Sequence, residues 1–180
     1  MNTIDTWVAR HRERAATLPG AALPWLTGRR RDAIDSFAAA GWPTSRLEAW
    51  RHTSLAFLDQ HPLAAPEDAP HPATTLAALR ADFDDGGHWL VFVDGHFEPT
   101  LSVRPPLPAG VTISALSEAL VRRPEAVEAA FGSAAGGDTA VVSSPYALNL
   151  ALCSDGAFVH LAPGTALEQP LHLVFIGATG

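Results

Sequence analysis

Three short β-rich runs near the end of the chain constrain its fold more than any other feature. They cover residues 139–142, 157–161 and 171–176. Ser-Pro, Asp-Gly and Pro-Gly pairs separate the runs, and no helical period links them. The pattern predicts short strands that stack on one another.

The last run, residues 171–176, is strongly apolar, and the residues that follow it offer nothing to cover it. A terminal edge strand of this kind leaves its backbone groups open to pairing with other chains. We therefore expect that the natural chain continues and that the 180 residues are a fragment. We also expect the isolated chain to self-associate through this β-edge.

The first 58 residues predict a helical region. One amphipathic helix begins behind Asn2 or Thr3 and fades at residues 18–20. A second helix is expected over residues 29–40, with Gly41 as a left-handed C-terminal cap. The side chains expected on the apolar faces of these two helices are Ile4, Trp7, Val8, His11, Ile34, Phe37 and Ala38.

The densest polar and aromatic stretch covers residues 44–53. Ser45 and Glu48 have the spacing of a capping box that would open a short third helix. Leu47 and Trp50 would fall on one face of that helix. This structural interpretation competes with a recognition surface in which Trp50 is the anchor.

Proline, glycine and aspartate residues mark the turns and loops in the middle of the chain. Residues 59–85 predict a proline-rich loop and connection. A hairpin follows, in which strands 89–93 and 96–101 are joined by the turn dipeptide at residues 94–95. Two strands alone are marginal, so the hairpin needs cover from other elements.

Residues 111–113 predict another short strand, with Ser114 as the N-cap of a helix. Apolar spacing around Pro124 predicts one broken helix or two short ones that stop at Gly132. Residues 132–137 are small and predict a linker, since this glycine-rich stretch follows a helix instead of opening one.

The chain contains no lysine, because all twelve of its lysine and arginine residues are arginine. Walker-type phosphate loops, Schiff-base chemistry and kinase-like ATP sites each need a lysine amine. The single cysteine, Cys153, excludes an internal disulfide framework and any site built only from this chain's thiolates.

The net charge of −7 is unevenly distributed, with eight arginines against five acidic residues in residues 1–51. The acidic majority elsewhere argues against a nucleic-acid partner. The arginines at positions 10, 12 and 14 and the run 29–31 are candidates for a basic patch, but arginines on helices are expected to be solvated. No apolar run is long enough for a membrane helix, and the N-terminus lacks a signal-peptide core. We expect a soluble, cytoplasmic protein that binds neither nucleic acid nor membrane.

Candidate metal ligands are few. His160 and His172 would approach each other if the β-rich runs stacked as successive coils, and Cys153 would then be near them. Two interpretations without a metal compete with this site. His160 would lie on a strand face that meets solvent or a partner. Cys153 would occupy a buried apolar position. The sequence therefore predicts no catalytic, cofactor-binding or metal-ligating residue.

Four collinear stretches resemble the SufD family of iron-sulfur cluster assembly proteins of the SUF system. The first holds Thr44, Glu48 and Trp50 at the family's spacing, and the second has Asp94 where the family usually has asparagine. The third ends in an Asp-Gly pair, and the fourth contains Pro-Gly and Leu-Glu pairs. The stretches are residues 43–55, 91–97, 147–156 and 159–173.

The resemblance implies a non-enzymatic scaffold component that acts with the paralogue SufB and the ATPase SufC. The cluster would be assembled at the SufB–SufD complex, and the fragment itself would hold no cofactor. The family's interface histidine and its SufC-binding helices would lie beyond residue 180. SufB is the nearest rival within the family.

Together, these features predict an α+β chain that ends in the first coils of a truncated β-helix. Residues 1–58 would form the helical region, 59–85 the proline-rich connection, 86–137 a small α+β unit with the hairpin, and 138–180 the start of the β-helix. The alternatives are a β-helix enzyme or sugar-binding protein and a helical adaptor domain. A hexapeptide-repeat acyltransferase would need a six-residue aliphatic repeat, which residues 139–180 lack.

Overall fold

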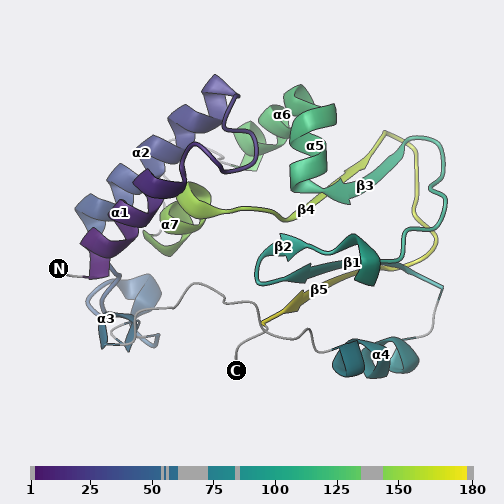
Figure 1. Ribbon diagram of the computed structural model, residues 1–180, viewed down its shortest axis with the longest axis horizontal. Coiled ribbons are helices and arrows are strands. Elements are labelled where there is room, and N and C mark those ends of the chain that lie inside the picture. Colours follow the sequence, from purple (N-terminus) through teal and green to yellow (C-terminus); the bar gives the residue numbers. More distant parts are fainter. Residues whose placement is uncertain are drawn as a thin grey trace. The chain divides into compact units, whose positions relative to one another are not determined.

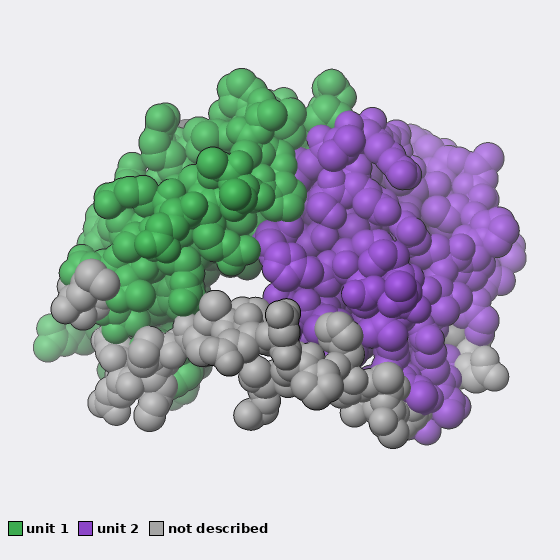
Figure 2. All heavy atoms as spheres, in the orientation of Figure 1, with its two compact units in different colours: residues 1–64, 124–153 green, residues 65–123, 154–180 purple. Residues whose placement is uncertain are grey.

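Segments that are far apart in the sequence combine into two units. The computed structural model describes residues 3–53, 55, 57–60, 73–83, 86–134 and 144–177. Unit 1 comprises residues 1–64 and 124–153, and unit 2 comprises residues 65–123 and 154–180 (Figure 2). The chain therefore crosses between the units three times.

Unit 1 is helical, and α2 contacts both α1 and α7 (Figure 1). Phe37 of α2 is fully buried in a cluster that contains Ala147 and Ala151 of α7. The predicted apolar face of α1, including Trp7, packs against the same cluster. The elements of unit 1 are α1 (Thr3–Arg14), α2 (Pro24–Ala40), the 3₁₀ turn η1 (Glu48–Trp50), α3 (Phe57–Gln60), α6 (Pro124–Ala134) and α7 (Ser144–Leu152).

The helix α2 begins earlier than the predicted residue 29, because Pro24 occupies its first turn. Proline suits this position, since its fixed φ fits a helix and its missing N–H would have had no partner there. Gly41 has φ +64°, and its N–H donates to Phe37 O at 2.8 Å, which confirms the predicted C-cap. Ala33 is buried and Ala38 is exposed, so the prediction for Ala38 is wrong.

The helix α7 contradicts the prediction that residues 139–180 lack a helical segment. Ala147 and Ala151 lie four residues apart and are both fully buried. Small side chains at this spacing let the α7 backbone approach α2 closely, so tertiary packing stabilises a helix that has little periodic signal. The predicted strand 139–142 lies outside the described residues.

Residues 44–53 do not form the predicted capping box. The 3₁₀ turn η1 begins after Leu47, which makes no side-chain capping bond. Glu48 pairs instead with Arg51, at 3.3 Å, and both side chains are exposed. Leu47 is 53% exposed and Trp50 is half-buried, so this stretch lies largely at the surface of unit 1.

Unit 2 contains two small β-sheets and α4 (Ala73–Asp82). In sheet A, β1 (His88–Val93) pairs antiparallel with β2 (His96–Phe97) and parallel with β5 (Leu171–Ile176). In sheet B, β3 (Val111–Ala115) pairs antiparallel with β4 (Ala157–Leu161). Residues 157–161 and 171–176 are therefore confirmed as strands, although they lie in different sheets.

The central strand β1 is covered on both faces, and all six of its residues are buried. Leu90 and Phe92 pack toward Val111 and Ile113 of sheet B. The alternate residues of β1 pack against Leu76 of α4. Figure 1 shows this order of layers, with α4 and sheet B on opposite sides of β1.

The helix α4 is absent from the sequence prediction, which treats residues 59–85 as a loop and connection. Its alanine, leucine and arginine residues favour a helix, but their apolar periodicity is weak, and the neighbouring prolines led to the prediction of a connection. Residues 61–72, which hold the prolines, lie outside the described residues. Among the described residues, no helix is long and apolar enough to cross a membrane.

The predicted hairpin is confirmed at its turn. Asp94 has φ +48° and Gly95 has φ +80°, the left-handed pair that a tight two-residue turn requires. The second strand ends at Phe97 and not at residue 101, because Pro99 starts the 3₁₀ turn η2 (Pro99–Leu101). Proline lacks the N–H that a strand would use for pairing.

The apolar spacing around Pro124 gives two short helices. The first, α5 (Leu116–Arg122), belongs to unit 2, and Pro124 starts α6 in unit 1. Helix α6 runs on to Ala134, so Gly132 does not stop it as predicted. Ser114 is not the N-cap of α5, since strand β3 continues to Ala115.

Candidate functional site: the Asp155 joint and the open edge

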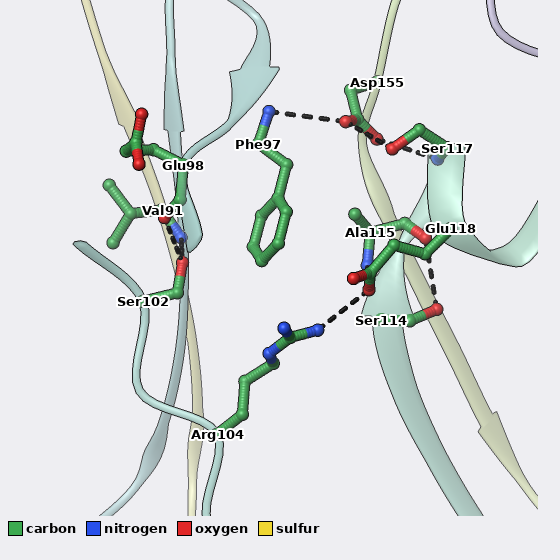
Figure 3. A network of polar contacts seen from close by, with 10 residues as sticks. All are labelled: Val91, Phe97, Glu98, Ser102, Arg104, Ser114, Ala115, Ser117, Glu118 and Asp155. Carbon is green, nitrogen blue, oxygen red and sulfur yellow. Dashed lines mark hydrogen bonds and ion pairs between the residues drawn. The ribbon is translucent and has the colours of Figure 1, made fainter. Parts of the chain in front are cut away.

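The carboxylate of Asp155 joins three elements of unit 2, an arrangement we call the Asp155 joint (Figure 3). Its Oδ1 accepts from the backbone N–H of Ser117 at 3.0 Å and of Gly156 at 2.9 Å. Its Oδ2 accepts from the Ser117 hydroxyl at 2.8 Å and from the Phe97 N–H at 3.3 Å. The joint thus links the end of β2, the first turn of α5 and the entry to β4.

This joint explains how α5 begins without the predicted Ser114 cap. The Asp155 carboxylate satisfies a free N–H in the first turn of α5 from a distant part of the sequence. Glu118 Oε2 accepts from the Ala115 N–H at 3.3 Å and from Arg104 at 2.8 Å. Both carboxylates therefore hold backbone in place.

An apolar strip follows strands β4 and β5, and we call it the open edge. In sheet A, Leu173 and Phe175 stand beside Leu90 and Phe92, and in sheet B, Val159 and Leu161 stand beside Ile113 and Val111. Residues directly opposite each other in a ladder share a face, so all four belong to the faces that form the core between the sheets. Their exposed fractions are Val159 42%, Leu161 43%, Leu173 44% and Phe175 65%.

The open edge contrasts with its partner strands. The four neighbours on β1 and β3 are between 0% and 8% exposed. Strand β5 is the last strand of sheet A on its side, and β4 has one neighbour in sheet B. The core between the sheets is therefore filled along β1 and β3 and open along β4 and β5, where both the apolar side chains and the backbone lack cover in the described residues.

The candidate metal ligands do not converge. His160 pairs with Thr112, and since its neighbours Val159 and Leu161 face the core, its side chain lies on the outer face of sheet B. His172 pairs with Trp89 on the face of sheet A that carries α4. Within the described residues, no group of three histidine, cysteine, aspartate or glutamate side chains could hold a metal ion.

Cys153 directly follows α7 in unit 1, where it is half-buried and its Sγ lies 3.7 Å from Leu150 O. Cys153 is therefore not fully buried, and the prediction of a buried apolar position for this thiol is wrong in that respect. Its backbone carbonyl has a more specific role, because it accepts from Arg30.

Arg30 is the structural residue that the sequence analysis missed. It is 4% exposed, and its two terminal nitrogens donate to Pro19 O at 2.8 Å and to Cys153 O at 3.1 Å. The prediction that the arginine run at residues 29–31 is solvated is therefore wrong for Arg30. The run gives no sign of this role, since both acceptors are backbone carbonyls outside the helix, 11 and 123 residues from Arg30 along the chain.

His11 lies close enough to Arg30 for its charge to matter. Burial lowers the pKa of His11 below its usual 6.5, and the positive charge of Arg30 lowers it further, while Asp35 opposes the shift. The His11 Nε2 atom is buried without a hydrogen-bond partner among the described residues. The neutral imidazole is thus the form that suits the folded helical unit.

Comparison with known proteins decides the family. A family model described as "SufBD protein N-terminal region" matches residues 1–173. The chain belongs to the SufBD family. The resemblance recognised from four short motifs is thereby confirmed as that of a SufB- or SufD-type protein, N-terminal part.

An iron-sulfur cluster assembly SufBD family protein from Synechocystis is 29% identical over 153 residues. The match covers 84% of this chain and 32% of the relative, so the chain spans about a third of that relative's length. This SufBD chain therefore corresponds to one part of a longer relative.

The SufBD motifs lie on elements with clear physical roles. Residues 91–97 are the β1–β2 hairpin, residues 147–156 run from α7 to the Asp155 joint, and residues 159–173 connect β4 to β5. Residues 43–55 are the exception, because most of their described side chains are exposed.

Proposed function

We propose that this SufBD chain is part of a SufD-type scaffold for iron-sulfur cluster assembly. The observation that carries the proposal is the family match over residues 1–173, and the similarity to the Synechocystis iron-sulfur cluster assembly protein supports it. The Thr44, Glu48 and Trp50 spacing favours the SufD type over the SufB type.

The scaffold would act with SufB and with the ATPase SufC in the cytoplasm, and the cluster would be built at the SufB–SufD complex. Two sequence features support a non-enzymatic role. The chain has no lysine for a phosphate-binding loop, so ATP hydrolysis would fall to a partner. Its one cysteine cannot supply the three or four thiolates of a cluster site.

We also propose that β4 and β5 are the first strands of a β-helix. The open edge supports this, since the next coil could pair with the backbone of β4 and β5 and bury Val159, Leu161, Leu173 and Phe175. Such a coil would complete the core between the sheets without any change in β1 or β3.

The proposal is tested by expressing the full-length protein together with SufB and SufC from the same organism, with an affinity tag on this protein alone. We expect all three to co-purify through size exclusion in a fixed ratio. A matched variant, Phe175→Lys, should reduce recovery of soluble full-length protein, while the exposed Val121→Lys should not. An intact wild-type product that associates with neither partner would overturn the scaffold function.

A further inference from the structure

A cavity of about 300 Å³ lies in unit 2 where α4 meets the start of β1. Its walls come from the last turn of α4, from the glycines before β1, from Trp89 and from Val103 and Pro105 after η2. This volume is at the small end of ligand pockets, and it suits a single-ring molecule. The proposed scaffold function does not use it.

Aromatic rings form one side of the cavity. Trp89 is 6% exposed and stacks on His172, with ring centroids 4.2 Å apart and planes inclined by 25°. Phe83 lies 5.8 Å from the same imidazole and is 52% exposed. The His172 stack fixes Trp89 in position, whereas Phe83 presents an uncovered ring at the cavity wall. A planar apolar group would gain contact area there at little conformational cost.

Arg80 supplies the polar part of the wall. One terminal nitrogen, Nη2, donates to Leu101 O, and the guanidinium carbon lies 5.7 Å from the Trp89 ring centroid. Its Nε is buried without an acceptor, and no carboxylate of the described residues pairs with it. Among the described residues, one carbonyl accepts from this guanidinium, which therefore keeps donor capacity and charge that a carboxylate satisfies best.

We propose that this cavity binds a small aromatic carboxylate, with the ring against Phe83 and Trp89 and the carboxylate on Arg80. The chemistry is shared by free aromatic acids and by the C-terminal residue of a peptide that ends in phenylalanine. Unit 2 holds four arginines and ten acidic residues, so long-range repulsion should keep the affinity modest.

Ligand-observed NMR on the whole 180-residue chain tests the proposal with phenylacetate, its amide phenylacetamide, and a tripeptide ending in phenylalanine. We expect phenylacetate to bind with Kd of about 1 mM or tighter, and phenylacetamide at least about tenfold more weakly. If the tripeptide binds more tightly than phenylacetate, the peptide terminus is the source; if it binds more weakly, the free acid is.

Two variants locate the binding. Val103→Phe should fill the cavity and weaken phenylacetate binding by about tenfold or more, while Val121→Phe, on the exposed face of α5 and 82% exposed before substitution, should leave it unchanged. Arg80→Gln, which removes the charge but keeps a side-chain N–H donor for Leu101 O, should remove the preference for phenylacetate over phenylacetamide. Absence of saturation transfer at several millimolar phenylacetate, equal binding of the amide, or equal effects of the two valine variants would overturn the proposal.

Discussion

Asp155 and Ser117 are joined twice, because separate oxygens of one carboxylate accept from the Ser117 N–H at 3.0 Å and from its hydroxyl at 2.8 Å. The pair spans 38 residues of sequence and places the first turn of α5 beside the entry to β4. A single carboxylate thereby sets the approach of the chain to the open edge.

Asp155→Asn should lower the free energy of unfolding by about 2 kcal/mol, since an amide NH₂ replaces one acceptor oxygen and faces N–H and O–H donors. Urea unfolding followed by circular dichroism measures the change. Glu168→Gln makes the same chemical change at an exposed carboxylate and should have little effect. Equal loss of stability in the two variants would show that the hydrogen bonds of Asp155 do not stabilise the fold.

Arg30→Met should lower the free energy of unfolding by about 2–4 kcal/mol. The substitution leaves Pro19 O and Cys153 O without their donor in a buried site. Thermal unfolding of this variant is compared with that of Arg31→Met, in which the neighbouring exposed arginine changes in the same way. A structural role confined to Arg30 predicts a large shift in Tm for the first variant alone.

Stability should fall as the pH drops below about 6.5, because of His11. The pKa of His11 is below 6.5 in the folded protein and close to 6.5 in the unfolded chain. At pH values between the two, the unfolded chain binds more protons and is therefore favoured. Above pH 6.5, His11 is neutral in both the folded and the unfolded chain, and its protonation costs no stability. As the pH falls from 6.5 to the pKa of His11 in the folded protein, this stability is progressively lost. His11→Gln should show a flatter dependence of unfolding free energy on pH between 7.5 and 5, and identical slopes would contradict the assignment.

The isolated chain should self-associate through the open edge, and Phe175→Lys should shift it toward the monomer. Phe175 is 65% exposed and stacks on Phe92 at 5.0 Å, so a charge there disrupts pairing more than folding. Sedimentation velocity over a range of concentrations measures the association. Val121→Lys is the matched control, and association that persists equally in both variants would place the contact elsewhere.

Two glycines should respond in opposite directions to alanine. Gly110 has φ +85°, and a Cβ there would lie 2.6 Å from Thr165 Cγ2, so Gly110→Ala should destabilise the protein by about 1 kcal/mol or more. Gly28 lies in α2 with nothing within 4 Å of an added Cβ, so Gly28→Ala should stabilise it by about 0.5–1 kcal/mol. Chemical unfolding of both variants tests the pair, and a shift of the same sign in each would contradict it.

The sequence by itself determined the elements whose signals are local. The Asp94-Gly95 turn needs two left-handed residues side by side, and the apolar face of α1 follows a helical period. The strands at residues 157–161 and 171–176 are bounded by turn pairs. Four motifs with family spacing were enough to recognise the SufBD family.

Only the tertiary structure decided the features that depend on distant partners. Helix α7 is fixed by its contact with α2, and the roles of Arg30 and Asp155 rest on hydrogen bonds that span up to 123 and 58 residues of sequence. The open edge likewise emerges only when the register of both sheets is known. Local patterns fix periodicity and turns, whereas burial of a charge or exposure of an apolar face depends on which distant segments fold against it.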